Sequence, residues 1–166
     1  DDFYPAYVMN YILGGGGFTS RLYQEVREKY GLAYSVYSYL VPLKHAGLYM
    51  GGVGTRNDGV VQSLDIIRAE IARLAEHSVS AEELSLAKQY LTGAFPLRLD
   101  TGSKVAGILV QMQFDGLGID YLERRNSYIE AVTLDDIGNV ARRLLDPERM
   151  RIVVVGNPED LALDGS

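Results

Sequence analysis

The sequence lacks cysteine altogether, and only two of its 166 residues are histidines. Without cysteine there can be no disulfide. A chain of this length can fold without one, so the absence fits either the cytoplasm or the periplasm. The histidines, His45 and His77, are far apart in the chain, and neither has a metal-binding partner at helical spacing. Catalytic zinc takes three protein ligands, so we expect no cofactor and no metal site in this chain.

Long apolar runs and clustered basic residues are also missing. No stretch approaches the roughly 20 apolar residues needed to cross a bilayer, so we expect no membrane span. The net charge of −6 leaves no basic stripe for a phosphate backbone, which argues against nucleic acid as a partner. The chain starts at Asp1 without a charged and apolar leader, so we expect it to begin inside a longer protein.

Helical periodicity and helix-start signals are frequent. Ser80 with Glu83 and Thr133 with Asp136 have the spacing of capping boxes, in which a hydroxyl and a carboxylate satisfy the first free amides of a helix. Apolar residues that recur at three- and four-residue steps predict helices over residues 4–13, 58–76, 81–93, 101–115, 119–130 and 133–145.

Segments rich in β-branched and aromatic residues predict three strands, over residues 33–41, 48–53 and 150–155. In the first of them, Tyr34 and Val36 should share one face of the sheet. A turn between the first two strands indicates a hairpin. We therefore expect residues 1–166 to form one domain of the α+β class, with a single, mostly antiparallel sheet covered on one face by several helices.

Residues 13–41 are the most informative segment, because LGGGGFTSRLYQEVREKYGLAYSVYSYLV joins a glycine run, a helix and a tyrosine-rich strand without a spacer. The four consecutive glycines, Gly14 to Gly17, allow backbone conformations that are closed to other residues. Thr19 or Ser20 can cap the following helix, and Gly31 can end it. The glycine run should link this helix to the one before it.

The segment GGGGFTSRLYQEVREKYGLAYSVYS resembles the C-terminal half-domains of the insulinase and pitrilysin class of zinc peptidases, which includes the mitochondrial processing peptidases and bacterial two-subunit relatives. The resemblance is dense over this segment and continues more loosely to RIVVVG near the end of the chain. It implies a processing-peptidase-like half-domain, part of a longer protein of the peptidase family, whose first strand lies upstream of Asp1.

The zinc peptidases of this class carry an inverted motif, H-x-x-E-H, in which two helix histidines bind zinc and the glutamate activates water. This chain does not contain the motif. The resemblance therefore implies that this chain is not catalytic by itself and that zinc belongs to a partner domain or subunit. The implied partners are that zinc-bearing domain or subunit and a peptide substrate, with a dimer as one possible assembly.

Arg27 and Tyr34, in REKYGLAY, are candidate substrate-binding residues. The resemblance implies that an arginine and a tyrosine with this spacing, at the corner between helix and strand, hold the substrate backbone. The chemistry is suitable, since a guanidinium fork and a phenol both donate hydrogen bonds to peptide carbonyls. The alternative is that Arg27 only favours the negative end of its helix, while Tyr34 packs as an ordinary strand aromatic.

Two further features have a functional and a structural interpretation. In one subunit of the processing peptidases a longer glycine-rich loop helps to handle substrate, so Gly14, Gly15, Gly16 and Gly17 are also candidate substrate-binding residues; a tight helix–helix turn is the alternative. Tyrosines of the helix and strand can line a groove for an extended peptide or pack half-buried on the sheet: Tyr30, Tyr34, Tyr37 and Tyr39.

Three functional hypotheses follow. The first is a noncatalytic, substrate-binding C-terminal domain of a zinc metalloendopeptidase that acts on peptides. The second is a proteolytically inactive structural or partner subunit, like the core proteins of the respiratory cytochrome bc complex. The third is a stand-alone peptide-binding module. The presence of both Arg27 and Tyr34 favours the first hypothesis.

Overall fold

We describe the fold from a computed structural model, which covers residues 2–43 and 45–160. The N-terminal half contains α1 (Phe3–Asn10), the π-helical turn η1 (Tyr11–Gly15), the 3-10 turn η2 (Gly17–Thr19), the π-helix η3 (Tyr23–Lys29), β1 (Ala33–Pro42) and β2 (Gly47–Thr55). The remainder contains η4 (Asn57–Gly59), α2 (Val60–His77), α3 (Ala81–Gly93), η5 (Phe95–Leu99), α4 (Gly102–Phe114), α5 (Tyr121–Ala131), α6 (Leu134–Leu144) and η6 (Pro147–Arg149).

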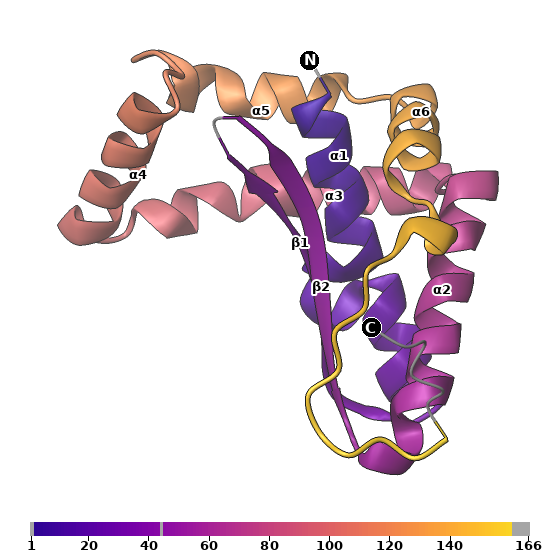
Figure 1. Ribbon diagram of the computed structural model, residues 1–166. Helices are drawn as coiled ribbons and strands as arrows, with labels where there is room; N and C mark the ends of the chain where they lie inside the picture. The colour runs from indigo at the N-terminus through magenta and orange to yellow at the C-terminus, as the bar shows by residue number, and fades with distance from the viewer. Residues whose placement is uncertain (1, 44, 161–166) are drawn as a thin grey trace.

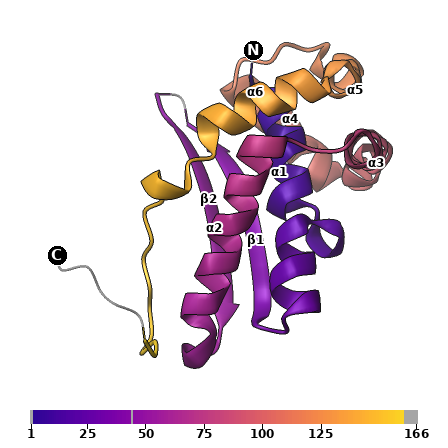
Figure 2. The same cartoon turned by 90° about the vertical axis from the view of Figure 1, so that its right-hand side faces the viewer.

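The sheet is an antiparallel hairpin of β1 and β2. Helices α1 and η3 and the turn η1 contact β1, and α2 contacts β2; Figures 1 and 2 show these helices on one side of the hairpin. On the other side, Tyr37 and Tyr39 are 50% and 41% exposed. The predicted α+β fold, with helices on one face of an antiparallel sheet, is confirmed.

The core lies between the hairpin and these helices and continues to the C-terminal helices. Its largest fully buried apolar side chains come from elements spread along the chain: Met9, Leu13, Leu74, Ile129 and Ile137. Burial of each such side chain contributes about 1.5–3 kcal/mol to folding. This shared core fixes η1 and η3, which carry the candidate site, against the rest of the molecule.

Helices α3, α4 and α5 form an arm that projects to the left in Figure 1. Its base is held by Arg125 of α5, a residue that is only 5% exposed. Arg125 Nη1 donates a hydrogen bond of 3.1 Å to the carbonyl oxygen of Leu91, in the last turn of α3. The guanidinium carbon also lies 4.1 Å from the ring centroid of Phe95, a cation–π distance. Arg125 thus joins α5 to the end of α3.

Both predicted capping boxes are confirmed. Ser80 Oγ accepts a hydrogen bond from the Glu83 amide at 3.1 Å, and Glu83 Oε2 accepts one from the Ser80 amide at 2.8 Å. Thr133 and Asp136 make the same reciprocal pair at the start of α6. These contacts satisfy amides that a helix start otherwise leaves without partners.

Two predictions about the N-terminal helices are wrong. The first helix does not end before the glycine run, because η1 includes Gly14 and Gly15 in a π-helical turn. Thr19 and Ser20 do not serve as helix caps in the expected way. Their hydroxyls donate to the carbonyl oxygens of Gly16 and Gly17, at 3.0 and 2.8 Å, so they close the glycine turn instead.

The predicted strand over residues 150–155 is also wrong. This segment forms no ladder with the other described residues, and Val153 and Val155 are 88% and 96% exposed. Figure 2 shows it beside the hairpin without joining it. β-branched residues favour an extended backbone, but a strand is stable only when a neighbouring strand completes its hydrogen bonds, and local sequence does not supply that neighbour.

Candidate functional site

The glycine run lies where η1 presses against β1. A Cβ atom on Gly14 would lie 2.4 Å from Ser38 Oγ and 2.7 Å from the Ser38 amide nitrogen, so no larger residue fits. Ser38 Oγ itself donates to Asn10 Oδ1 at 2.8 Å and lies 3.2 Å from the hydroxyl of Tyr49, whose pKa burial raises to about 12. At least Gly14 is therefore required for packing, which supports the interpretation as a tight turn.

The other end of the glycine run forms the turn that presents Phe18. Gly17 has a φ of +58°, a left-handed conformation that other residues rarely adopt. Gln24 Nε2 donates to the carbonyl oxygen of Phe18 at 2.6 Å, so the following helix holds the turn from outside. Phe18 is nevertheless 72% exposed.

Arg27 lies on η3 as the end member of a row of three side chains. Its guanidinium carbon is 5.0 Å from the ring centroid of Tyr23. The same ring meets Phe18 edge to face, with the two centroids 5.0 Å apart and the planes at 89°. Tyr23 is only 8% exposed, whereas Arg27 is exposed. We call this arrangement the Phe18–Tyr23–Arg27 row; it places the guanidinium of Arg27 over the Tyr23 ring while the residue as a whole stays exposed.

Tyr34 lies in a β-bulge at the start of β1. Ala33 pairs with Thr55 and Ser35 pairs with Gly54, so Tyr34 is the extra residue between the two pairs. The prediction that Tyr34 shares a face with Val36 is therefore wrong: Val36 is 6% exposed, but Tyr34 is 71% exposed. A bulge re-aims the side chain that it carries, and here it turns the phenol outward.

The corner between η3 and β1 brings Arg27 and Tyr34 to neighbouring elements. Gly31 takes a φ of +63° there, and its amide donates to the carbonyl oxygen of Arg27 at 3.0 Å. Leu32 closes the same turn with a bond of 3.0 Å to Val26. Within residues 2–43 and 45–160, neither the guanidinium of Arg27 nor the hydroxyl of Tyr34 has a hydrogen-bond or ion-pair partner. Both residues are exposed.

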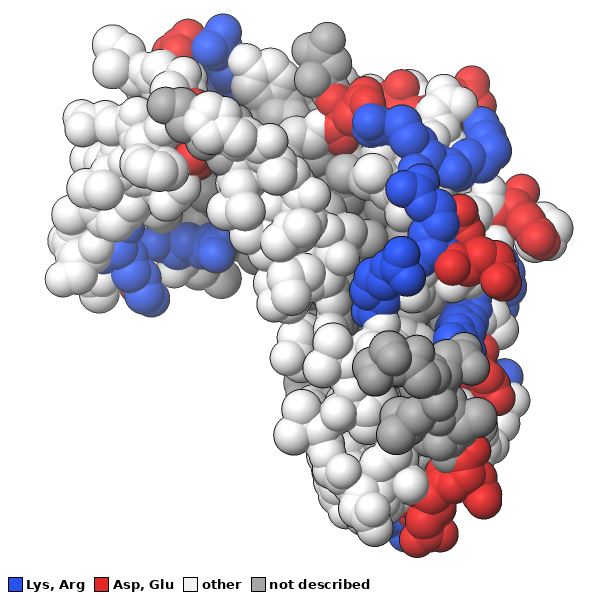
Figure 3. Space-filling view, in the orientation of Figure 1, with Lys and Arg blue, Asp and Glu red and all other residues white. Residues whose placement is uncertain are grey.

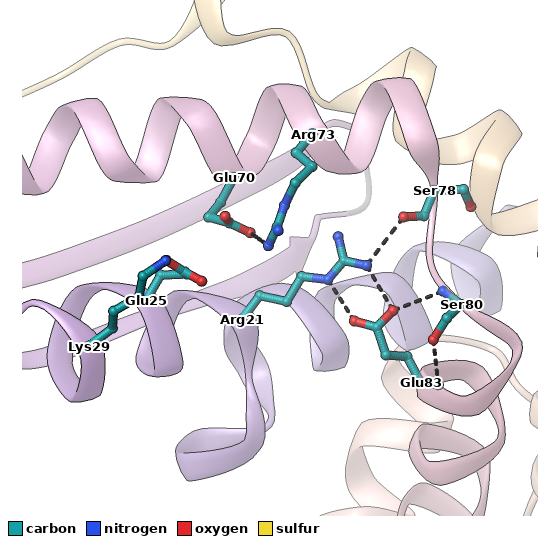
Figure 4. Close-up of polar contacts among 8 residues, drawn as sticks. All are labelled: Arg21, Glu25, Lys29, Glu70, Arg73, Ser78, Ser80 and Glu83. Carbon is teal, nitrogen blue, oxygen red and sulfur yellow. Dashed lines mark hydrogen bonds and ion pairs between the residues drawn. The ribbon is translucent and has the colours of Figure 1, made fainter.

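The helix that carries Arg27 is tied to α3 by an ion pair at its start (Figure 4). Arg21 Nε and Nη2 donate to the two carboxylate oxygens of Glu83, at 2.7 and 2.8 Å, and Nη2 also lies 3.2 Å from the carbonyl oxygen of Ser78. Hydrogen bonds from Arg21, together with the amide of Ser80, lower the pKa of Glu83 from 4.5 to about 2. The contact thus holds Glu83 ionised and η3 in place.

Further ion pairs line the same side of the molecule. Lys29 Nζ lies 2.8 Å from Glu25 Oε2, one turn earlier on η3, and this bond raises the pKa of Lys29. On α2, Arg73 pairs with the buried carboxylate of Glu70. Figure 4 shows these pairs beside Arg21. Because each positive group has a carboxylate partner, this cluster supports the helices and does not form an anion site.

The histidines do not form a metal centre. His45 is exposed, and the His77 side chain is 74% exposed with Glu76 as its neighbour at 3.8 Å. Among residues 2–43 and 45–160, no three His, Cys, Asp or Glu side chains are placed to share a metal ion. The donor set of this part of the chain therefore does not fit a zinc site.

None of the described helices is both long and apolar enough to cross a bilayer.

Charge is distributed unevenly over the surface. Figure 3 shows basic and acidic side chains gathered over α2, α6 and the C-terminal segment, whereas the face over the hairpin is nearly free of charge.

The four tyrosines proposed for a peptide groove are all exposed to a large extent, with Tyr30 at 46%. They are not buried by the sheet, and Tyr37 stacks on Tyr39 with their centroids 6.0 Å apart.

Sequence reasoning proposed Arg27 and Tyr34 as site residues but did not predict the residues that contact Arg27 and its helix. Tyr23 and Arg27 are four positions apart, so their contact could have been found from helical spacing. The contact of Phe18 with Tyr23 crosses a turn, and Arg21 and Glu83 are separated by 62 positions. No local pattern signals contacts of this kind.

Two curated proteins are similar to this chain over most of its length. A curated relative, an uncharacterized zinc protease from Streptomyces coelicolor, is 40% identical over 156 residues, which is 92% of this chain and 33% of the relative. A non-peptidase homolog from Helicobacter pylori is 28% identical over 150 residues, or 90% of this chain and 34% of the relative. The chain thus spans about a third of the length of these proteins.

A solved structure and a family profile complete the comparison. The peptidase M16 inactive domain from Pseudomonas fluorescens has the same fold, with a TM-score of 0.79 at 30% identity, over 89% of this chain and 35% of that one. Residues 1–91 match the profile described as the peptidase M16 inactive domain. The resemblance to C-terminal half-domains of zinc peptidases is confirmed: the chain belongs to the peptidase M16 inactive domain family.

Proposed function

We propose that residues 1–166 form one domain, the noncatalytic and substrate-binding C-terminal domain of a zinc metalloendopeptidase that acts on peptides. The observation that carries this proposal is the exposed pair of donors, Arg27 and Tyr34, on a π-helix and a β-bulge that are joined by one turn, with no hydrogen-bond or ion-pair partner for either side chain among the described residues. Zinc and the water that it activates would belong to a partner domain or subunit, because the donor set of the described residues does not fit the metal.

The chemistry of the pair is that of positioning. The guanidinium of Arg27 can donate two parallel hydrogen bonds to carbonyl oxygens of an extended peptide, and the phenol of Tyr34 can donate a third. Neither residue breaks a bond. Holding the peptide in one orientation lowers the entropic part of the barrier for a reaction that takes place on the partner. Gly15 and Gly17, both exposed, are the members of the glycine run that could also touch the peptide.

The test uses the full-length protein together with its zinc-bearing domain or subunit. Arg27→Gln removes charge-assisted hydrogen bonds, each worth about 1.5–3 kcal/mol, so kcat/KM for peptide cleavage should fall by about ten- to hundredfold. Tyr34→Phe removes only the hydroxyl and should lower it by about two- to tenfold. The control is Arg124→Gln on α5, an exposed arginine of the arm, which should leave turnover unchanged.

Unchanged turnover in the double variant of Arg27 and Tyr34, with an unaltered melting temperature, would refute the substrate-binding role. A second candidate, an inactive partner subunit, is favoured by the relative from Helicobacter pylori, which is described as a non-peptidase homolog. In that case the protein should bind extended peptides, or a sister subunit, without cleaving them. Reading the sequence upstream of Asp1 for H-x-x-E-H separates the two candidates.

A further inference from the structure

Phe18 combines two properties that rarely occur together on a surface: a large exposed apolar ring and a fixed backbone. The residue is 72% exposed at the tip of the glycine turn. The turn below it is closed by hydrogen bonds from Thr19 and Ser20 to glycine carbonyls and by the bond from Gln24 to the carbonyl of Phe18. Because the backbone is already ordered, covering the ring with a ligand would require little further loss of entropy.

Tyr23 fixes the position of Phe18 relative to Arg27. Its ring contacts the ring of Phe18 edge to face and the guanidinium of Arg27, each at 5.0 Å from its centroid. These contacts explain why Tyr23, although it lies beside two exposed residues, is itself only 8% exposed. An apolar contact surface and a set of hydrogen-bond donors therefore lie at a fixed separation, as in sites that bind a backbone and one side chain together.

We propose that Phe18 determines side-chain specificity at this site, by packing against one bulky apolar side chain of the peptide whose backbone Arg27 and Tyr34 hold. Tyr23 is the positioning residue that links the two contacts. This inference rests on the proposed function of the chain, because it takes the ligand to be an extended peptide.

The surroundings of Phe18 select the kind of side chain. The positive charge of Arg27, one ring away, disfavours a lysine or arginine of the ligand. Contact with a phenyl ring would desolvate an acidic side chain without offering it a hydrogen bond. Thr19 and Gln24, which bond to the backbone of the same turn, are polar and exposed, so we take the apolar group of the ligand to be one side chain and not a docking helix. Leucine, methionine and phenylalanine fit these conditions.

The test measures binding of short fluorescent peptides to the full-length protein by anisotropy. The peptides form sets that differ at one position, which carries alanine, leucine, phenylalanine or lysine. The wild-type protein should bind the leucine or phenylalanine peptide of one set about tenfold more tightly than the alanine peptide, which is about 1.4 kcal/mol. Phe18→Ala should reduce this preference to about twofold or less, whereas Phe18→Leu should keep most of it.

Phe114→Ala is the matched control, because Phe114 is 78% exposed on the arm and outside the proposed site. The inference would be overturned if Phe18→Ala kept the preference for leucine or phenylalanine over alanine, or if the wild-type protein showed no such preference. Arg27→Gln separates this result from the proposed function, since it should weaken all peptides equally without changing the preference. If the wild-type protein binds no peptide, the proposed function fails and the inference fails with it.

Discussion

Glu83→Gln should weaken the attachment of η3 to α3, because it removes the charge that Arg21 contacts through two hydrogen bonds. The Arg21 side chain is only 15% exposed, so its guanidinium depends on this partner. The substitution keeps the shape of the side chain and one carbonyl oxygen for the helix cap. It therefore tests the ion pair more than the packing.

The magnitude follows from the pKa of Glu83. A fall of this pKa from 4.5 to about 2 would correspond to about 3 kcal/mol if it were fully expressed as stability. Because the Glu83 side chain is 33% exposed, solvent screens the pair, and we expect about 1–2 kcal/mol for Glu83→Gln at neutral pH. The folded pKa lies below the ordinary value, so this stability is present above about pH 4.5 and is lost as the pH falls toward 2.

Urea denaturation followed by circular dichroism, repeated from pH 7 down to pH 3, measures both effects. The matched control is Glu82→Gln, which makes the same change of charge at an exposed neighbour in the first turn of α3. The free energy of unfolding of the control should fall by less than about 0.5 kcal/mol, because only the interaction of the Glu82 charge with the helix dipole is lost. The reasoning is refuted if the two variants are equally stable at pH 7, or if the difference between wild type and Glu83→Gln does not shrink at low pH.

Two further substitutions test the packing of the site and of the arm by the same denaturation assay. Gly14→Ala should lower the free energy of unfolding by about 2–3 kcal/mol, because its Cβ would collide with Ser38. The control is Gly107→Ala in α4, where nothing lies within 4 Å of the added Cβ, and it should stabilise the protein by about 0.5–1 kcal/mol. A small effect of Gly14→Ala would show that η1 can move away from β1. Arg125→Ala should lower the free energy of unfolding by about 2–4 kcal/mol, because it removes the stack on Phe95 and the hydrogen bond to Leu91. The same change at the exposed neighbour, Arg124→Ala, should lower it by less than about 1 kcal/mol. Equal losses of stability would contradict the role of the buried Arg125.

Elements that depend on neighbouring residues could be predicted from the sequence. The capping boxes at Ser80 and Thr133 are complete within four residues, and the stripe of α2 repeats over five turns of helix, so both are visible without the fold. The hairpin could be predicted for the same reason, because its two strands are joined by a short turn.

Features that depend on distant contacts or on an irregular backbone could not be predicted from the sequence. The π-helical turns η1 and η3 differ from an α-helix in winding, and the apolar spacing of Leu22 and Val26 fits both. The bulge at Tyr34 adds one residue to β1, so the alternation of the strand predicts the wrong face for its first residues. The ion pair of Arg21 with Glu83 requires α3 to lie beside η3, which only tertiary packing decides.

The bulge at Tyr34 has a consequence for how this domain can change through evolution. Along the rest of β1, the inward residues Val36 and Ser38 must satisfy the core and the contact with Gly14, so they have little freedom to vary. Tyr34 is released from that alternation, because the extra residue lets it point outward whatever its neighbours require. A relative could therefore exchange the tyrosine for another side chain with almost no effect on folding, and the ligand binding that we propose for this residue could change independently of the fold.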